Sequence, residues 1–229
     1  MNETETYVLA ALLDVIGYRD RLERDRISGR LDFKDALQKA MNVLSNVNEA
    51  DYAYQAISDT IIITSVNVTD LAGLLSVLKD VQLSFLREGL LVRGGVAHER
   101  HFKSNTITYS HALALAHQIE IDIAVYPRVV VDHNVIEMQR GNTDAWLQLS
   151  SSALVCVWNG VYFLNILDQK NWPDVYNWAK SVYEAERKTL VGKEKEFLKH
   201  AWLEHYLFGS PFAKEGHERY IPSPGLLTK

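Results

Sequence analysis

Two carboxylates interrupt strongly apolar parts of the sequence. Asp14 lies near the end of the apolar run 7–16, and Asp59 lies between two β-branched runs, 52–57 and 60–66. An ionised carboxylate among aliphatic side chains is costly unless it is paired or bound to a cation. Two such groups on neighbouring strands would repel each other, and bound divalent cations would remove that repulsion. Carboxylate, water and phosphate oxygens suit Mg²⁺ or Mn²⁺ better than zinc.

Two further features fit a phosphate ligand. Gly17 allows close approach to the backbone, and the helix expected after it offers free N–H groups at its N-terminus. Arg93 stands on an otherwise apolar strand beside two glycines, and such a guanidinium pairs with a carboxylate or a phosphate. Simpler structural roles stay open: a helix cap for Asp14, a turn residue for Asp59, and an ion pair with Asp59 or another acid for Arg93.

The hydrophobic pattern predicts the elements that must position these residues. Strands are expected at 7–16, 52–57, 60–66, 90–97 and 128–132, and helices at 18–27, 32–48, 70–88 and 109–121. A second hairpin at 154–158 and 161–166 and two amphipathic helices at 173–189 and 193–208 follow. This order predicts an α+β sandwich around one mixed sheet. We expect a core of 1–145, with 146–229 adding a hairpin and helices that complete the same domain.

Composition narrows the class of protein. The chain has 229 residues, and its 24 basic and 29 acidic side chains, which give a net charge of −5, are interleaved. A duplex-binding role is therefore not expected, because nucleic-acid proteins carry a basic face. The sequence has no apolar run of about 18 residues, so no membrane helix is predicted. An acidic start and a single cysteine, Cys156, expected to be buried, fit a reducing cytoplasm.

Several short segments, taken in order, resemble the catalytic domain of class III nucleotidyl cyclases. The segments are 12–18 (LLDVIGY), 57–60 (ISDT), 92–96 (VRGGV) and the helix 110–120. More narrowly, with 126–130 (YPRVV) and 160–163 (GVYF), the chain is similar to the pyrimidine cyclases of bacterial Pycsar anti-phage systems. The resemblance covers residues 7–132 by motif and the rest more loosely. It implies a class III nucleotidyl cyclase-like, ferredoxin-like palm fold with added C-terminal helices.

The resemblance also implies a role for each candidate residue. Asp14 and Asp59 would hold two divalent ions, Mn²⁺ or Mg²⁺, with the Val15 carbonyl as a further ligand. Arg93 would bind the triphosphate from its strand. The β- and γ-phosphates would be held by the turn that contains Gly17, Tyr18 and Arg19. The 3′-hydroxyl of a nucleoside triphosphate would then attack its own α-phosphate and release pyrophosphate.

The implied assembly is a head-to-tail homodimer with two active sites at its interface. The cyclic nucleotide would activate a separate effector in phage defence, which the cyclase does not contact directly. Tyr54 and Gln55 are expected to select the base, because an amide both donates and accepts and so suits a pyrimidine edge. We predict UTP as substrate and cUMP as product, with CTP and cCMP as the alternative. The simpler interpretation is that Tyr54 and Gln55 are alternating strand residues.

The chain departs from the family at two positions. Class III cyclases commonly carry an Asn and, four residues later, an Arg that act on the partner's substrate, and the matching residues here are Ala114 and Gln118. Arg19, Arg100 or Lys103 would have to substitute, or turnover is impaired. A second hypothesis is therefore a non-catalytic, nucleotide-binding cyclase-like dimer, which the two intact aspartates oppose. A third is a diguanylate cyclase or polymerase palm, which shares the metal carboxylates.

Overall fold

The computed structural model describes residues 6–104 and 106–225. The chain divides into two compact units, Met1–Ile166 and Leu167–Lys229. The hairpin expected at the start of the 146–229 segment belongs to the sheet of the first unit. That the whole chain completes one domain, with a core of 1–145, stays a prediction.

The first unit is built on one mixed sheet. Within the described ranges the sheet has eight strands in the order β2-β3-β1-β4-β6-β8-β7, with β5 paired to β4. Only β4 and β6 run parallel among these pairs. The strands are β1 Thr6–Val15, β2 Ala53–Ile57, β3 Thr60–Ser65, β4 Val92–Lys103, β5 Thr108–Ser110, β6 Val129–Val131, β7 Val155–Trp158 and β8 Val161–Leu164. This confirms the predicted α+β architecture with a mixed sheet.

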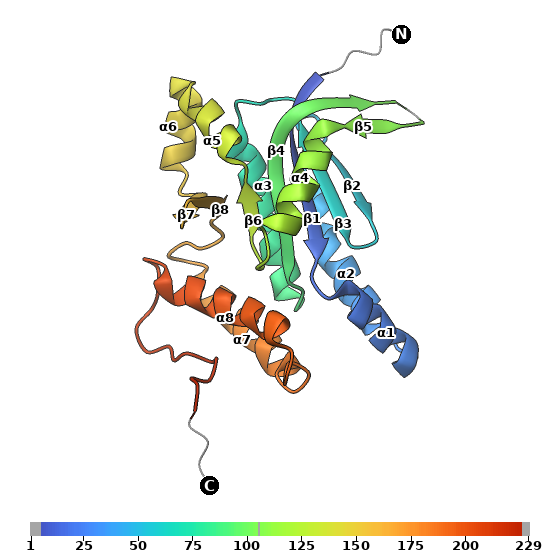
Figure 1. Cartoon of the computed structure of the whole chain (residues 1–229), viewed down its shortest axis with the longest axis vertical. Helices are drawn as coiled ribbons and strands as arrows, with labels where there is room; N and C mark the ends of the chain where they lie inside the picture. The colour runs from blue at the N-terminus through green and yellow to red at the C-terminus, as the bar shows by residue number, and fades with distance from the viewer. Residues whose placement is uncertain (1–5, 105, 226–229) are drawn as a thin grey trace. The chain divides into compact units, whose positions relative to one another are not determined.

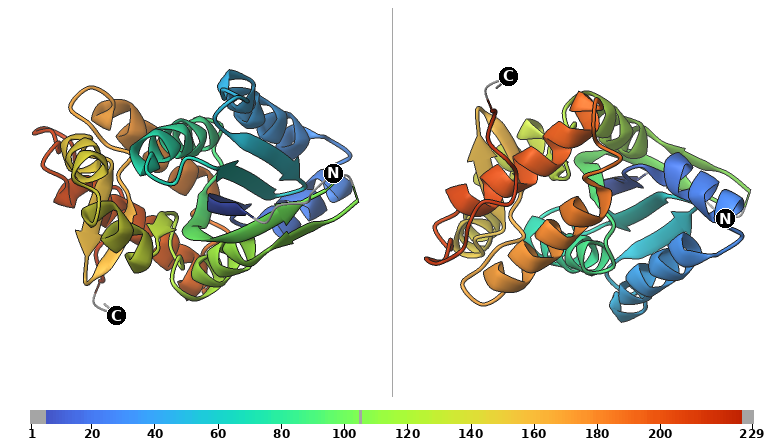
Figure 2. Two further views of the ribbon diagram at one scale, coloured as in Figure 1. Left: turned by 90° about the horizontal axis from the view of Figure 1, so that it is seen from above. Right: turned by 90° about the horizontal axis from the view of Figure 1, so that it is seen from below.

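Helices cover both faces of the sheet, with α3 and α4 on opposite sides of it (Figures 1 and 2). Val8 and Ala10 of β1 contact Ala112 of α4, while the alternate residues Leu9 and Leu13 are fully buried on the other face. This double cover explains why β1 is almost entirely apolar. The helices are α1 Tyr18–Ser28, α2 Asp32–Met41, the 3₁₀ helix η1 Asn42–Asn46, α3 Leu71–Arg87, α4 His111–Asp122, α5 His133–Arg140 and α6 Thr143–Ser151.

The structure departs from the predicted elements at several points, and from the predicted burial of Cys156. The helix expected at 32–48 ends at Met41 and tightens into η1, where the Ser45 hydroxyl donates to the Asn42 carbonyl at 2.7 Å. Strand β4 runs on to Lys103, because its polar half pairs with β1 and β5. Helices α5 and α6 and strand β5 were not predicted. Cys156 is half-buried instead of buried, since β7 is an edge strand.

Asp70 links the start of α3 to two other elements. Its carboxylate accepts hydrogen bonds from the Gly73 N–H at 2.8 Å, the Tyr52 hydroxyl at 3.3 Å and the Gln148 amide at 3.3 Å. We expect Asp70→Ala to lower the free energy of unfolding by about 1–2 kcal/mol, the usual cost of losing an N-cap. Urea unfolding measures this change. Asp80→Ala, on an exposed position of the same helix, should stay within about 0.5 kcal/mol of the parent.

The ionisation of the Tyr52 hydroxyl provides a second measurement of its contact with Asp70. Burial, with the Asp70 carboxylate next in importance, raises the pKa of Tyr52 to about 12. The pKa of Tyr52 should therefore fall in Asp70→Ala but stay above its ordinary value of about 10, because the burial remains, as followed by tyrosine-selective NMR during an alkaline titration. An unchanged titration together with unchanged stability would contradict the capping role of Asp70.

The second unit pairs helix α7, Trp172–Glu186, with helix α8, Glu194–Gly209. The indole N–H of Trp172 donates to the Leu207 carbonyl at 2.9 Å. The buried Glu204 carboxylate accepts from the backbone N–H groups of Tyr220 and Ile221 and so holds the following segment against α8. Among the described residues, no helix combines the length and apolarity needed to cross a membrane.

Candidate active site

The structure brings Asp14 and Asp59 together. Asp14 is the penultimate residue of β1 and faces Thr60 of β3, while Asp59 is the turn residue just before Thr60. The backbone N–H of Val15 donates to the Asp59 carbonyl at 3.2 Å, which ties the hairpin turn to the end of β1. The two carboxyl groups lie close enough for Asp59 to affect the ionisation of Asp14. Residues separated by 44 intervening positions thus form one acidic site.

The electrostatic environment of Asp14 is unfavourable for a bare charge. Burial raises the pKa of the Asp14 carboxyl above its ordinary value, and the neighbouring Asp59 raises it further. The Arg93 guanidinium opposes this rise. A cation placed between the two acids would relieve both the desolvation and the repulsion.

Arg93 is held between two acids. It sits opposite Asp14 in the β1–β4 register, with its Nε 3.5 Å from Asp14 Oδ2. Its Nη2 lies 2.6 Å from Oε1 of Glu120 on α4. Arg93 therefore forms ion pairs, as its simpler structural role predicts, and its partners are Asp14 and Glu120. A guanidinium has five N–H donors, so these contacts leave donors that could reach a phosphate oxygen.

Gly95 allows α4 to pack closely enough for the contact between Glu120 and Arg93. A Cβ at this position would lie 2.3 Å from the Ala116 carbonyl oxygen of α4 and 2.9 Å from Cβ of Ile119. Real side chains do not come this close to backbone atoms, so the glycine is required for the helix to lie where it does.

The turn after β1 carries the predicted phosphate-binding residues. Gly17 has φ 77°, a left-handed conformation that favours glycine, and it precedes α1 without any side-chain cap for the helix. The ring of Tyr18 packs edge-on against Phe33, with the centroids 5.4 Å apart. Arg19 is exposed. The turn therefore places an uncapped helix N-terminus three residues after Asp14.

The two predicted base-selecting residues lie on opposite faces of β2. Gln55 pairs with Ile62 of β3, which shares the sheet face of Asp14, and Gln55 is exposed. Tyr54 pairs with Ile63, whose side chain is fully buried on the other face. The interpretation of these residues as alternating strand positions matches this arrangement. We therefore retain Gln55 in the candidate site and omit Tyr54.

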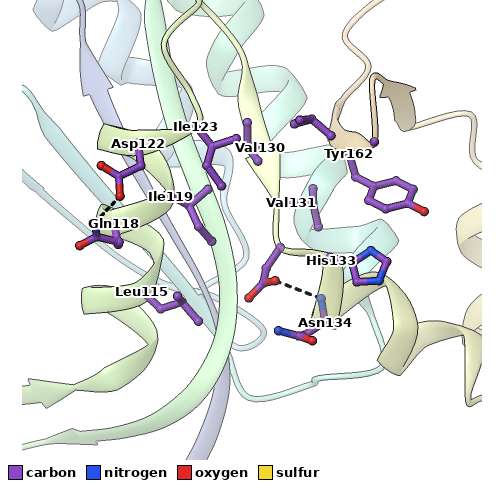
Figure 3. Close-up of a pocket in the computed structure, with 13 residues that line it drawn as sticks. Leu115, Gln118, Ile119, Asp122, Ile123, Val130, Val131, His133, Asn134 and Tyr162 are labelled. Atoms are coloured by element: carbon purple, nitrogen blue, oxygen red, sulfur yellow. Dashed lines mark hydrogen bonds between the residues drawn. The ribbon is translucent and has the colours of Figure 1, made fainter.

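The positions where cyclases commonly carry Asn and Arg lie on the exposed surface of α4. Ala114 and Gln118 are exposed on α4, and the Gln118 amide hydrogen-bonds to Asp122 one turn later (Figure 3). Gln118 also lines a cavity of about 360 Å³ between α4, β6 and β8. Among the predicted substitutes, Arg100 is exposed beside Glu99 on β4, with its Nε 3.7 Å from that carboxylate. Lys103 ends the same strand, and Arg19 lies on α1.

Sequence reasoning missed Glu120 as a member of the site. The residue is only 3% exposed, although it carries a carboxylate. A signal was present in the sequence, because Ala112, Ala116, Ile119 and Glu120 share the buried face of α4. An acid on such a face needs a basic partner, and the strand beneath it supplies Arg93.

The donor set fits a hard divalent cation that keeps part of its hydration. In the ranges that the structure describes, no group of three or more His, Cys, Asp or Glu is arranged to hold a metal. The candidate ligands are the two carboxylates of Asp14 and Asp59 and the Val15 carbonyl. Mg²⁺ and Mn²⁺ commonly bind through one or two carboxylates together with water and substrate phosphates, which is the chemistry that this pair offers.

Comparison with known proteins gives structural neighbours of low identity. No protein-family model matches the chain, and no curated protein matches it. The guanylyl cyclase domain of the RhoGC fusion protein from the aquatic fungus Blastocladiella emersonii is 7% identical, with a TM-score of 0.48 over 70% of this chain and 96% of that one. An adenylate cyclase from Trypanosoma brucei is 12% identical, with a TM-score of 0.47 over 70% of this chain and 90% of that one.

A bacterial light-regulated adenylyl cyclase is 10% identical, with a TM-score of 0.44 over 60% of this chain. This chain spans only 46% of the length of that protein. These three solved structures are adenylyl or guanylyl cyclases.

Proposed function

We propose that this chain is a metal-dependent nucleotidyl cyclase that converts UTP to 3′,5′-cyclic UMP and pyrophosphate. The observation that carries the proposal is the convergence of Asp14 and Asp59 beside an uncapped helix N-terminus. An acidic pair suits divalent cations, and a helix N-terminus suits phosphate groups. A nucleoside triphosphate bound through its metal ions would use both.

The residues of this chain would bind and orient the substrate. Asp14, Asp59 and the Val15 carbonyl would hold two divalent cations, Mn²⁺ or Mg²⁺. When bound, these ions would lower the pKa of the 3′-hydroxyl and neutralise the leaving pyrophosphate. The backbone N–H groups of Gly17, Tyr18 and Arg19 would anchor the β- and γ-phosphates.

The reaction needs little covalent chemistry from the protein. The 3′-oxygen forms a bond to the α-phosphorus, the bond from that phosphorus to the bridging oxygen breaks, and the hydroxyl proton passes to water. The protein contributes by holding the sugar and the α-phosphate in line for this attack. Donors of Arg93 not used by Asp14 and Glu120 would contact the triphosphate.

The base preference of the proposal rests on Gln55. Its side chain is exposed on the sheet face that carries Asp14, and its amide can pair with the donor and acceptor edge of uracil. Cytosine presents a related edge, so CTP and cCMP form the alternative substrate and product. The proposed assembly is a homodimer, and the proposed role is production of a second messenger for a separate anti-phage effector, as the sequence resemblance implies.

Product identification tests the proposal. The purified chain is incubated with Mn²⁺ and each of the four common ribonucleoside triphosphates, and the products are identified by mass spectrometry. We expect 3′,5′-cyclic UMP, formed from UTP about tenfold faster than a cyclic product from either purine nucleotide, because the hydrogen-bonded base edge differs. If the reaction is faster with CTP than with UTP, CTP is the substrate instead of UTP. A linear or dinucleotide product would instead indicate polymerase or diguanylate cyclase chemistry.

A non-catalytic nucleotide-binding dimer is the second candidate function. The observation that favours it is the exposed Gln118, which bonds to its own helix neighbour Asp122 and lacks the charge of an arginine. The same incubation separates the two candidates. Binding of a nucleotide without any cyclic product, over the range of Mn²⁺ concentrations that saturates binding, would support the non-catalytic function.

A further inference from the structure

Glu120 is a buried acid to which the proposed function assigns no role. Its side chain is 4% exposed, and its close ionic contact is to Nη2 of Arg93 at 2.6 Å. The alignment of this contact lies outside good hydrogen-bond geometry, so Oε1 of Glu120 is a buried oxygen held by charge. A buried carboxylate is costly to keep unless its partner is retained with it.

Arg93 is shared unequally between its two acids. Its contact with Glu120 is 2.6 Å, while its contact with Asp14 is 3.5 Å. Asp14 and Arg93 are directly opposite each other in the sheet register, so the guanidinium has no need to move along the strand to pair fully with Asp14. The guanidinium nevertheless lies closer to Glu120 on the helix above than to Asp14.

The charge count explains why this matters. The cluster contains three carboxylates, Asp14, Asp59 and Glu120, against one guanidinium. With Arg93 matched by Glu120, the charges of Asp14 and Asp59 stay available to a divalent cation. Without the carboxylate of Glu120, Arg93 would neutralise Asp14 and compete with the cation for it.

We propose that Glu120 is a positioning residue that holds the Arg93 guanidinium off Asp14 and thereby keeps the Asp14 carboxylate available for a divalent cation. The inference rests on the proposed function in one respect, that Asp14 and Asp59 bind such a cation. It concerns the affinity of the acidic pair for the ion and does not require Glu120 to touch ion or substrate.

The test measures Mn²⁺ binding by the full-length chain without nucleotide, using electron paramagnetic resonance to count free Mn²⁺. We expect Glu120→Gln to weaken Mn²⁺ binding by about tenfold, because the positive charge of Arg93 would then be free to pair with Asp14 and compete with the cation. The double variant Glu120→Gln/Arg93→Gln should bind Mn²⁺ within about twofold of the parent, since the competing guanidinium is gone. A merely structural role of Glu120 predicts no such recovery in the double variant.

The matched control is Glu99→Gln. It makes the same change in the exposed ion pair between Glu99 and Arg100, which lies on β4, the strand that also carries Arg93. It should leave Mn²⁺ binding unchanged, because this pair lies outside the cluster. Glu120→Asp keeps the charge and should bind Mn²⁺ more tightly than Glu120→Gln.

The outcomes separate this inference from the proposed function. Parent-like Mn²⁺ binding by Glu120→Gln overturns the inference, even where cyclic nucleotide is still formed. Tenfold weakening with recovery in the double variant supports the inference, even where no triphosphate is cyclised. If Glu120→Gln fails to fold by circular dichroism, the double variant decides alone: Mn²⁺ binding as tight as the parent supports the inference, and weaker binding overturns it.

Discussion

Asp59→Asn is expected to reduce cyclic-nucleotide formation to a small residual rate while the chain stays folded. The substitution keeps the shape of the turn residue and removes one of the two carboxylates that converge at the end of β1. Metal ions contribute several kcal/mol to charge stabilisation in reactions of this kind, so the rate should fall on the order of a thousandfold. The measurement is the initial rate of product formation at saturating Mn²⁺ and UTP.

The same variant should be slightly more stable than the parent in the absence of metal. Removing Asp59 ends its repulsion of Asp14, which is worth roughly 0.2–1 kcal/mol for partly exposed charges. Mn²⁺ should raise the melting temperature of the parent, because a ligand bound only by the folded state stabilises it, and should not raise that of the variant. Asp80→Asn, an exposed change on α3, serves as the control for both measurements. Full activity in Asp59→Asn would remove the acidic pair from the mechanism.

Gly95→Ala is expected to be severely destabilising, although it adds a single methyl group. The new Cβ would meet the Ala116 carbonyl oxygen at 2.3 Å, and this atom belongs to the backbone of α4, which cannot rotate away as a side chain could. Either the helix shifts or the sheet deforms, at a cost of about 1–3 kcal/mol or more. Urea unfolding followed by circular dichroism measures the loss.

A matched change elsewhere separates crowding from the general effect of replacing glycine. Gly141 has a helical φ of −69°, and a Cβ there would meet only Met138 O, at 3.4 Å, and Glu137 O, at 3.8 Å. Gly141→Ala should therefore be neutral or raise stability by about 0.4–1 kcal/mol. If Gly95→Ala folds, it should also weaken Mn²⁺ binding, since a displaced α4 carries Glu120 away from Arg93. Parent-like stability in Gly95→Ala would contradict the close packing of α4 on β4.

Much of the fold could be predicted because its signals are local. The apolar run of β1, the leucine spacing of α3 and the Asn159–Gly160 turn between β7 and β8 each reveal their element without reference to distant residues. The prediction was wrong where a distant partner decides the conformation. The polar second half of β4 becomes a strand only because β1 and β5 pair with it.

By itself, the sequence determined which residues carry unusual chemistry: two acids in apolar surroundings, an arginine beside two glycines, and a glycine before a helix. Only the tertiary structure decided what these residues face. Sheet register placed Gln55 on the face of Asp14 and Tyr54 on the other, and the packing of α4 brought Glu120 onto Arg93. The physical reason is that the cost of burying a charge can be read from its immediate neighbours in sequence, whereas the partner that offsets this cost is chosen by register and helix packing over long distances along the chain.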